Sequence, residues 1–323
     1  MLDPLIRLVS ALGSPAGQRA RLSILIYHRV VPREDPLFPS LPAAAEFDVQ
    51  MRTLARQFNV IPLADAVTGL RGGSLPARAA CVTFDDGYAD NAEVALPVLL
   101  RHRVPATFFV ATDFLDGGRM WNDTIIEAVR LTRKSSLDLN ELGLGAHEVQ
   151  TLGERRKLAR WLLDALKYVA HEERLARVTR IEQIAGEDLP RNLMMTTDQV
   201  RAMHRAGMGI GGHTASHPIL ARLDRAAARA EIQRGKDKLE EIIQSRVAHF
   251  AYPNGKPGED YLPEHVGIVK EMGFDAAVTT AQGVSFGASD PYQLPRFGPW
   301  DKSPVKYALR MTQNLFRTSY KHV

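Results

Sequence analysis

Short apolar runs recur along the chain, and each one ends abruptly in polar or glycine-rich residues. This pattern is typical of strands that are buried on both faces of a parallel sheet and whose carboxyl ends open into loops. The runs span residues 24–27, 80–84, 106–110, 208–212, 249–252 and 276–279. They predict six strands of a parallel sheet or barrel.

Between these runs the apolar residues recur three or four apart, which is the period of a helix with one buried face. Several of these segments end near a glycine, as helices often do. They span residues 47–58, 91–102, 198–206, 226–243 and 263–272. Alternation of strands with helices predicts an α/β fold.

Residues 122–195 interrupt this alternation, because they show strong helical periodicity and no convincing strand. One apolar face there is formed by Leu158, Leu162, Leu166 and Val169. No low-complexity linker separates the segment, so we predict a single domain over residues 1–323 with a helical insertion at 122–195. Its charged face is typical of solvated surface, but an insertion beside a barrel mouth could also form a lid or a substrate wall.

Length and composition permit one large domain, since 323 residues of which 45% are hydrophobic can bury a substantial core. Lysine and arginine exceed aspartate and glutamate by only four. This balance does not indicate a nucleic-acid partner. The single cysteine, Cys81, excludes an internal disulfide and a multi-cysteine metal site, and its apolar neighbours predict a buried thiol.

The first 22 residues contain a short apolar stretch that Arg7 interrupts. A bilayer-spanning helix needs about 20 apolar residues. A signal peptide needs an unbroken apolar core after a basic start, and here Asp3 comes first. We therefore predict a cytoplasmic protein with neither a signal peptide nor a transmembrane helix. The stretch predicts an amphipathic helix that packs on the barrel or contacts a membrane surface or another subunit through residues 1–22. The sequence does not indicate the oligomeric state.

Two adjacent carboxylates, Asp85 and Asp86, follow the apolar run at 80–84 in the sequence TFDDGY. Neighbouring strand residues point to opposite faces, so continued extension would separate the two. Gly87 permits a sharp turn, so that both can reach one pocket. Two like charges this close are unfavourable unless a cation or a proton intervenes, and a metal ion is the simplest solution.

Two imidazoles, His213 and His217, lie four residues apart in the sequence GGHTASHP. The preceding glycines and the following Pro218 favour a strand end and a tight loop, and either a loop or a helix can chelate one ion with this spacing. Two histidines and a carboxylate leave coordination positions open, as a catalytic zinc site requires. The pair alone is weak evidence, but together with the strand-terminal Asp-Asp-Gly it predicts a metal site.

The motifs TFDDGY and HTASH resemble those of the NodB-type polysaccharide deacetylases, carbohydrate esterase family four. The resemblance covers residues 22–121 and 196–300 and implies a distorted (β/α)7 barrel. It implies that Asp85 is the general base and that the metal ligands are Asp86, His213 and His217, with Thr214 steadying the loop between the histidines. Zn²⁺ is the expected ion, and Co²⁺ or Ni²⁺ also suit this ligand set.

The sequence FAYPNG resembles the family's third motif, in which an arginine often stands two residues before the proline and tethers the catalytic aspartate. This chain has Ala251 at that position. We predict Arg296 as the replacement, and the alternative is an arginine that anchors a loop or lies at the surface. The resemblance implies contacts between substrate and Tyr252, Pro253 and Asn254, with the backbone amide near Asn254 in the place of the family's oxyanion donor.

The family also uses a histidine as general acid, usually in a motif near the carboxyl end, and no such motif follows Trp300. The first predicted strand instead ends in Tyr27-His28-Arg29-Val30. This looks like the circularly permuted branch that includes biofilm poly-N-acetylglucosamine deacetylases, in which the first strand supplies that histidine. The resemblance therefore implies His28 as the acid, and the alternative is a structural histidine.

These features predict a metal-dependent hydrolase that removes N-acetyl groups from an amino sugar, a polysaccharide or its precursor and releases acetate. An alternative enzyme is a deformylase or another amidohydrolase acting on a lipid-linked sugar. In a different class, a catalytically silent carbohydrate-binding barrel stays open because of the alanine at position 251. The predicted location favours a precursor bound for an exopolysaccharide or surface glycan, and the sequence does not identify the sugar.

Overall fold

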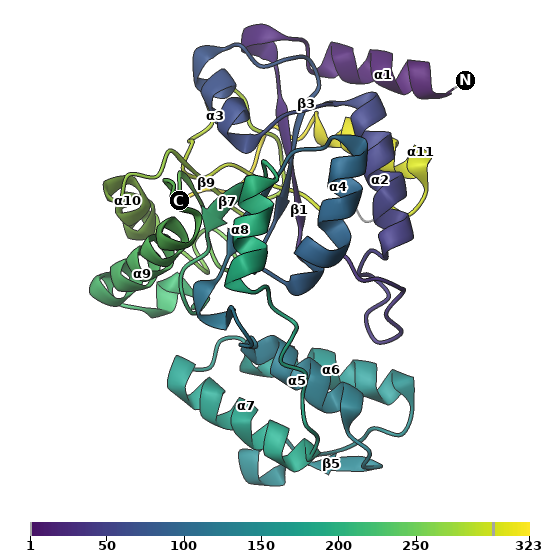
Figure 1. Cartoon of the computed structure of the whole chain (residues 1–323), viewed down its shortest axis with the longest axis vertical. Helices are drawn as coiled ribbons and strands as arrows, with labels where there is room; N and C mark the ends of the chain where they lie inside the picture. The colour runs from purple at the N-terminus through teal and green to yellow at the C-terminus, as the bar shows by residue number, and fades with distance from the viewer. Residues whose placement is uncertain (1, 299–300) are drawn as a thin grey trace.

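A parallel sheet of seven strands forms the centre of the molecule in the computed structural model, which describes residues 2–298 and 301–323 (Figure 1). The strand order is β1-β3-β4-β7-β8-β9, and β2 pairs with the first two residues of β3. All six predicted strands are present. The strands are β1 (Leu22–Tyr27), β2 (Asn59–Val60), β3 (Ala79–Phe84), β4 (Ala106–Val110), β7 (Gly209–Gly212), β8 (His249–Ala251) and β9 (Ala276–Val278).

An irregular segment, residues 294–297, closes the sheet between its two outer strands. Leu294 forms a parallel bridge with Val278 of β9, and Phe297 forms one with Leu25 of β1. Pro295 lies between them and has no N–H to donate, so the segment cannot form a regular ladder. The curled sheet is therefore a distorted barrel, and the fold prediction is confirmed.

Successive side chains of the barrel strands enter two different hydrophobic clusters, because they point to opposite faces of the sheet. Leu25 and Tyr27 pack with Phe47 of the helix outside them. Ile24 packs in the other cluster with Cys81 and Phe109. Cys81 is the buried thiol that its apolar neighbours predict.

Helices cover the outside of the barrel. The five helical patterns are confirmed, although the pattern at 91–102 is a π-helical turn (Asn91–Ala95) followed by α4. The barrel helices are α2 (Ala44–Gln57), α3 (Leu63–Gly72), α4 (Leu96–His102), α8 (Thr197–Arg205), α9 (Arg225–Ile243) and α10 (Pro263–Glu271). The terminal helices α1 (Leu2–Gly13) and α11 (Pro304–Asn314) pack against each other. No helix in the described part of the chain has the length and apolarity needed to cross a membrane.

The segment between β4 and β7 forms a helical body at one end of the barrel (Figure 1). Its helices α5 (Trp121–Leu131), α6 (Leu152–Leu166) and α7 (His171–Ala185) enclose a hydrophobic cluster that includes Leu158, Leu162 and Leu166. The expectation of no strand here is wrong. The strands β5 (Ser136–Asp138) and β6 (Ala146–Glu148) form a small antiparallel sheet. They are three residues long, and Leu137 is the only fully buried residue in them, so they leave no readable alternation.

Candidate metal centre and its pocket

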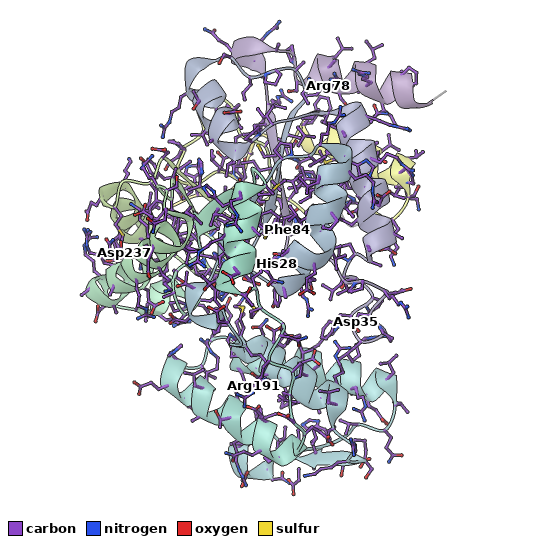
Figure 2. All side chains as sticks on the ribbon, in the orientation of Figure 1. His28, Asp35, Arg78, Phe84, Arg191 and Asp237 are labelled. Atoms are coloured by element: carbon purple, nitrogen blue, oxygen red, sulfur yellow. The ribbon has the colours of Figure 1, made fainter. Side chains whose placement is uncertain are left out.

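The polar residues of the predicted site gather at the end of the barrel where the carboxyl ends of the strands meet. Residues that follow different parallel strands come to the same edge of the sheet. His28 follows β1, Asp85 and Asp86 follow β3, and His213 follows β7. Figure 2 shows His28 near Phe84, the last residue of β3, on the side of the barrel that faces α5.

Asp86, His213 and His217 converge on one point. Their potential ligand atoms all lie within 4.8 Å of one another. The Nε2 atom of each histidine is 3.4 Å from Oδ1 of Asp86, and the two imidazole centroids are 4.7 Å apart. Two imidazole nitrogens and one carboxylate oxygen are a donor set that suits a divalent transition metal and leaves positions open for other ligands.

The loop after β7 is built to hold both imidazoles. His213 Nδ1 lies 2.7 Å from the carbonyl oxygen of Ala251, which directs Nε2 toward Asp86. The Thr214 hydroxyl donates to the His213 carbonyl at 2.5 Å and accepts from the His217 N–H at 3.1 Å. This agrees with the expectation that Thr214 steadies the loop.

Backbone strain is concentrated around the same point. Asp86, Thr214 and His217 have φ angles of 77°, 63° and 55°, which non-glycine residues seldom adopt. Gly235 of α9 lets that helix approach closely, because a Cβ atom there would lie 2.5 Å from the Thr214 carbonyl oxygen. The surrounding packing therefore imposes the loop conformation.

Asp85 forms a buried ion pair with Arg296. The two guanidinium nitrogens donate to the two carboxylate oxygens at 2.7 Å each. Arg296 also donates to Oγ1 of Thr83 at 3.1 Å and to the carbonyl of Thr279 at 2.9 Å, so its position is fixed. Burial disfavours the charged form of Asp85, but Arg296 outweighs this and holds the pKa of Asp85 below its usual value. The guanidinium comes from the segment that closes the barrel.

Burial and nearby charge act differently on the two histidines. Burial lowers the pKa of His217 to about 4, so this imidazole is neutral at pH 7 and can donate a lone pair to a metal ion. Burial also opposes protonation of His213, but Asp86 and Asp85 outweigh it and raise the pKa of His213. Burial disfavours ionised Asp86 too, yet its interactions with His213 and His217 hold its pKa below the usual value. An ionised carboxylate beside two imidazoles is a donor set that a divalent cation fits.

The centre lies in a pocket of about 270 Å³ with two walls. The barrel contributes one wall, which consists of His28, Asp85, Asp86, His213, His217, Asn254 and Thr280. The residues before and within α5 and α6 contribute the other, which consists of Met120, Trp121, Asn122, Leu163, Asp164 and Lys167. Apart from the junction at Met120 and Trp121, the second wall is formed by the segment that the sequence predicts as an insertion.

His28 is exposed at the rim of this pocket. Asn91 donates to its carbonyl at 2.8 Å, which fixes the backbone that carries the imidazole. Asn254 lines the pocket with a φ of 59°, and its carbonyl accepts from Thr280 at 2.9 Å. Its N–H donates to no acceptor in the part of the chain that the structure describes.

The other two residues of the third motif lie outside the lining of the pocket. The Tyr252 hydroxyl donates to the carbonyl of Tyr292 at 3.1 Å, and its ring stacks on Tyr261 at 3.9 Å between centroids. Tyr252 and Pro253 are both buried. Of this motif, only Asn254 faces the site.

Sequence reasoning missed a second buried network beside the metal centre. Arg29 pairs with Asp90 at 2.8 Å and lies over the ring of Tyr88, whose hydroxyl donates to Oδ1 of Asp123 at 3.1 Å. Burial, assisted by the charge of Asp86, raises the pKa of Asp123 to about 7. The network ties α5 to the loop of Asp86. No motif or spacing in the sequence links these residues.

The sequence model of a family described as polysaccharide deacetylase matches residues 72–138 and 170–277, just over half of the chain. Among curated proteins, a poly-beta-1,6-N-acetyl-D-glucosamine N-deacetylase of Staphylococcus epidermidis is 24% identical over 209 residues, which cover 58% of this chain and 70% of that protein.

Solved structures share the fold at low identity. The deacetylase PplD of Streptococcus pyogenes, solved in complex with acetate, has a TM-score of 0.61 at 19% identity and aligns over 91% of this chain and 98% of its own. IcaB from Ammonifex degensii has a TM-score of 0.61 at 20% identity and aligns over 93% and 98%.

Proposed function

The chain belongs to the polysaccharide deacetylase family, and on this basis we propose that it is a metal-dependent hydrolase that removes N-acetyl groups from an amino sugar, releasing acetate. The observation that carries the proposal is the convergence of Asp86, His213 and His217 directly beside the Asp85–Arg296 pair, at the base of a pocket. The similarity to a poly-N-acetylglucosamine deacetylase supports an acetylated polysaccharide of this class as substrate.

Asp86, His213 and His217 would hold the divalent metal. Zn²⁺ suits this ligand set, and Co²⁺ or Ni²⁺ are alternatives. When bound, such an ion supplies Lewis acidity toward the acetamide carbonyl and toward water. The neutral His217 and the fixed Nε2 of His213 are prepared for this role.

The remaining side chains have complementary roles in amide hydrolysis. Asp85 accepts a proton from the water that attacks the acetamide carbon, and Arg296 keeps Asp85 ionised and in position. The free N–H of Asn254 donates to the oxygen that becomes negative in the tetrahedral intermediate. His28 donates a proton to the departing nitrogen, and the C–N bond breaks. Acetate and a free amine leave.

The second wall of the pocket has the chemistry of a sugar site. Trp121 offers an aromatic surface, and Arg174 lies over its ring at 5.0 Å. Asn122 and Asp164 offer hydrogen-bonding groups, and Oδ1 of Asn122 is buried without a partner in the described residues. These groups suit the hydroxyls and apolar face of a pyranose ring.

The pairing of Arg296 with Asp85 weighs against a silent carbohydrate-binding barrel, since the tether that Ala251 cannot provide comes from another segment. The test is acetate release by the metal-loaded protein from acetylated glucosamine oligomers, with an N-formyl substrate as the competing acyl group. Asp85→Asn should abolish turnover and preserve metal binding. Turnover by Asp85→Asn at the wild-type rate would refute the base assignment, and faster formate release would favour a deformylase.

A further inference from the structure

The terminal helix α1 has its apolar face turned outward. Ile6 and Ser10 are buried, whereas Leu8 and Leu12 are 58% and 75% exposed. Leu5 and Val9 lie on the same exposed side. A helix on the surface of a water-soluble protein normally buries its leucines and exposes its serines. The arrangement of α1 is the reverse.

The carboxyl-terminal helix α11 continues this exposed apolar surface. Ser10 of α1 and Thr312 of α11 share a buried hydrogen bond of 2.8 Å, which fixes the two helices side by side (Figure 1). Of the thirteen exposed large apolar side chains in the described part of the chain, seven lie here. We call them the α1–α11 face: Leu5, Leu8, Val9, Leu12, Val305, Leu309 and Phe316.

The two helices that form this face carry more positive than negative charge. Together α1 and α11 contain three basic residues, Arg7, Lys306 and Arg310, and one acidic residue, Asp3, and Arg310 pairs with Asp301. Arg7 of α1 and Lys306 of α11 are exposed alongside the apolar side chains. An apolar helical face flanked by cations is the pattern of a helix that lies in the interface of an anionic membrane.

We propose that the α1–α11 face docks the protein onto the surface of a bilayer containing anionic lipids. The sequence leaves a membrane contact open for residues 1–22, and the structure adds α11 as a second half of the surface. The apolar side chains insert among the lipids, and Arg7 and Lys306 contact the headgroups. Self-association through this face is less favourable, because a two-fold contact would place the cations of both copies together.

Docking and catalysis are separable in this arrangement. Figure 1 places α1 at the end of the molecule away from α5–α7, whereas the candidate pocket lies between the barrel and that helical body. The proposal therefore does not depend on the proposed reaction.

The test is co-sedimentation of the full chain with two kinds of vesicle. One contains phosphatidylcholine alone, and in the other about one lipid in three is phosphatidylglycerol. The wild type should bind the anionic vesicles, and Leu8→Ser with Leu12→Ser should weaken binding about tenfold or more. Lys306→Gln should weaken it about fivefold. Leu175→Ser is the matched control, since Leu175 is an exposed leucine on α7, and it should bind like the wild type.

The proposal would be overturned if the wild-type protein does not bind anionic vesicles. It would also be overturned if the Leu8/Leu12 variant binds them as tightly as the wild type. Light scattering tests whether a second copy covers the face instead. If the wild type is a dimer, the Leu8/Leu12 variant is a monomer and neither binds vesicles, the face belongs to a second copy. Acetate release from a soluble substrate should be the same in all four proteins, so a failed docking test leaves the proposed reaction intact.

Discussion

Replacement of Arg296 by glutamine gives the sharpest test of the site. The side chain has no exposed surface and makes two hydrogen bonds of 2.7 Å to Asp85, which is itself only 2% exposed. Glutamine has a similar length but no charge. It would leave Asp85 as a buried carboxylate without a counter-ion.

The structure sets the expected magnitude. Removal of one partner from a buried ion pair destabilises a protein by about 3–5 kcal/mol, because the remaining charge stays desolvated. The Asp85 carboxylate also loses the fork that orients it, so kcat should fall about 10²-fold or more. Metal affinity should change little, since Arg296 donates its hydrogen bonds to Thr279, Thr83 and Asp85 and not to Asp86, His213 or His217.

Urea unfolding at pH 7 measures the stability change, acetate release measures kcat, and titration calorimetry with Zn²⁺ measures metal binding. Arg296→Lys retains the charge without the fork and should lose less stability than the glutamine variant. Arg78→Gln is the control, because Arg78 is buried but donates to the carbonyl of Gln57 and lies at the other end of the barrel (Figure 2). Equal stability and kcat in Arg296→Gln and Arg78→Gln would refute the reasoning.

Three further changes probe the surroundings of the site. Burial raises the folded pKa of Asp123 to about 7 from 3.8, so its contribution to stability is present at low pH and is lost as the pH rises through the folded pKa. Metal-free Asp123→Asn should therefore gain on the wild type by about 3 kcal/mol between pH 5 and pH 8 in urea unfolding, and a constant difference would show that Asp123 is ionised throughout. Gly235→Ala should destabilise the protein by about 1–3 kcal/mol and weaken Zn²⁺ binding, because its Cβ would lie 2.5 Å from the Thr214 carbonyl oxygen. An increase in stability, which alanine in place of glycine usually gives in a helix, would contradict this expectation. Trp121→Ala should raise KM for an acetylated glucosamine oligomer about tenfold with a smaller change in kcat, whereas an unchanged KM would remove Trp121 from the sugar site.

The barrel could be predicted from sequence because its strands are buried on both faces. Runs such as 80–84 and 106–110 are apolar without interruption, and the polar residue after each run marks the carboxyl end. Other elements were missed. In the closing segment 294–297, Pro295 disrupts the ladder, and β2, β5 and β6 are two or three residues long and too short to show a period. The helices α3 and α11 were not predicted either.

The site could be predicted only where residues sit in a local motif. Asp85 and Asp86 share one turn, and His213 and His217 share one loop, so each pair can be recognised from a short stretch of sequence. The contact between Arg296 and Asp85 joins residues 211 positions apart. It was inferred because the family's arginine is missing at Ala251, and no pattern around Arg296 indicates it. The pocket wall from α5 and α6 had no comparable signal, since its polar residues look like ordinary helix surface.

The position of Arg296 makes the candidate site depend on a segment that is synthesised after all of its other residues. A nascent chain contains both aspartates and both histidines of the centre long before residue 296 leaves the ribosome. Until then Asp85 has no counter-ion and the sheet is not closed between β9 and β1, so the candidate site cannot form completely. A product that ends before residue 294 should consequently be inert, even though it contains Asp86, His213 and His217.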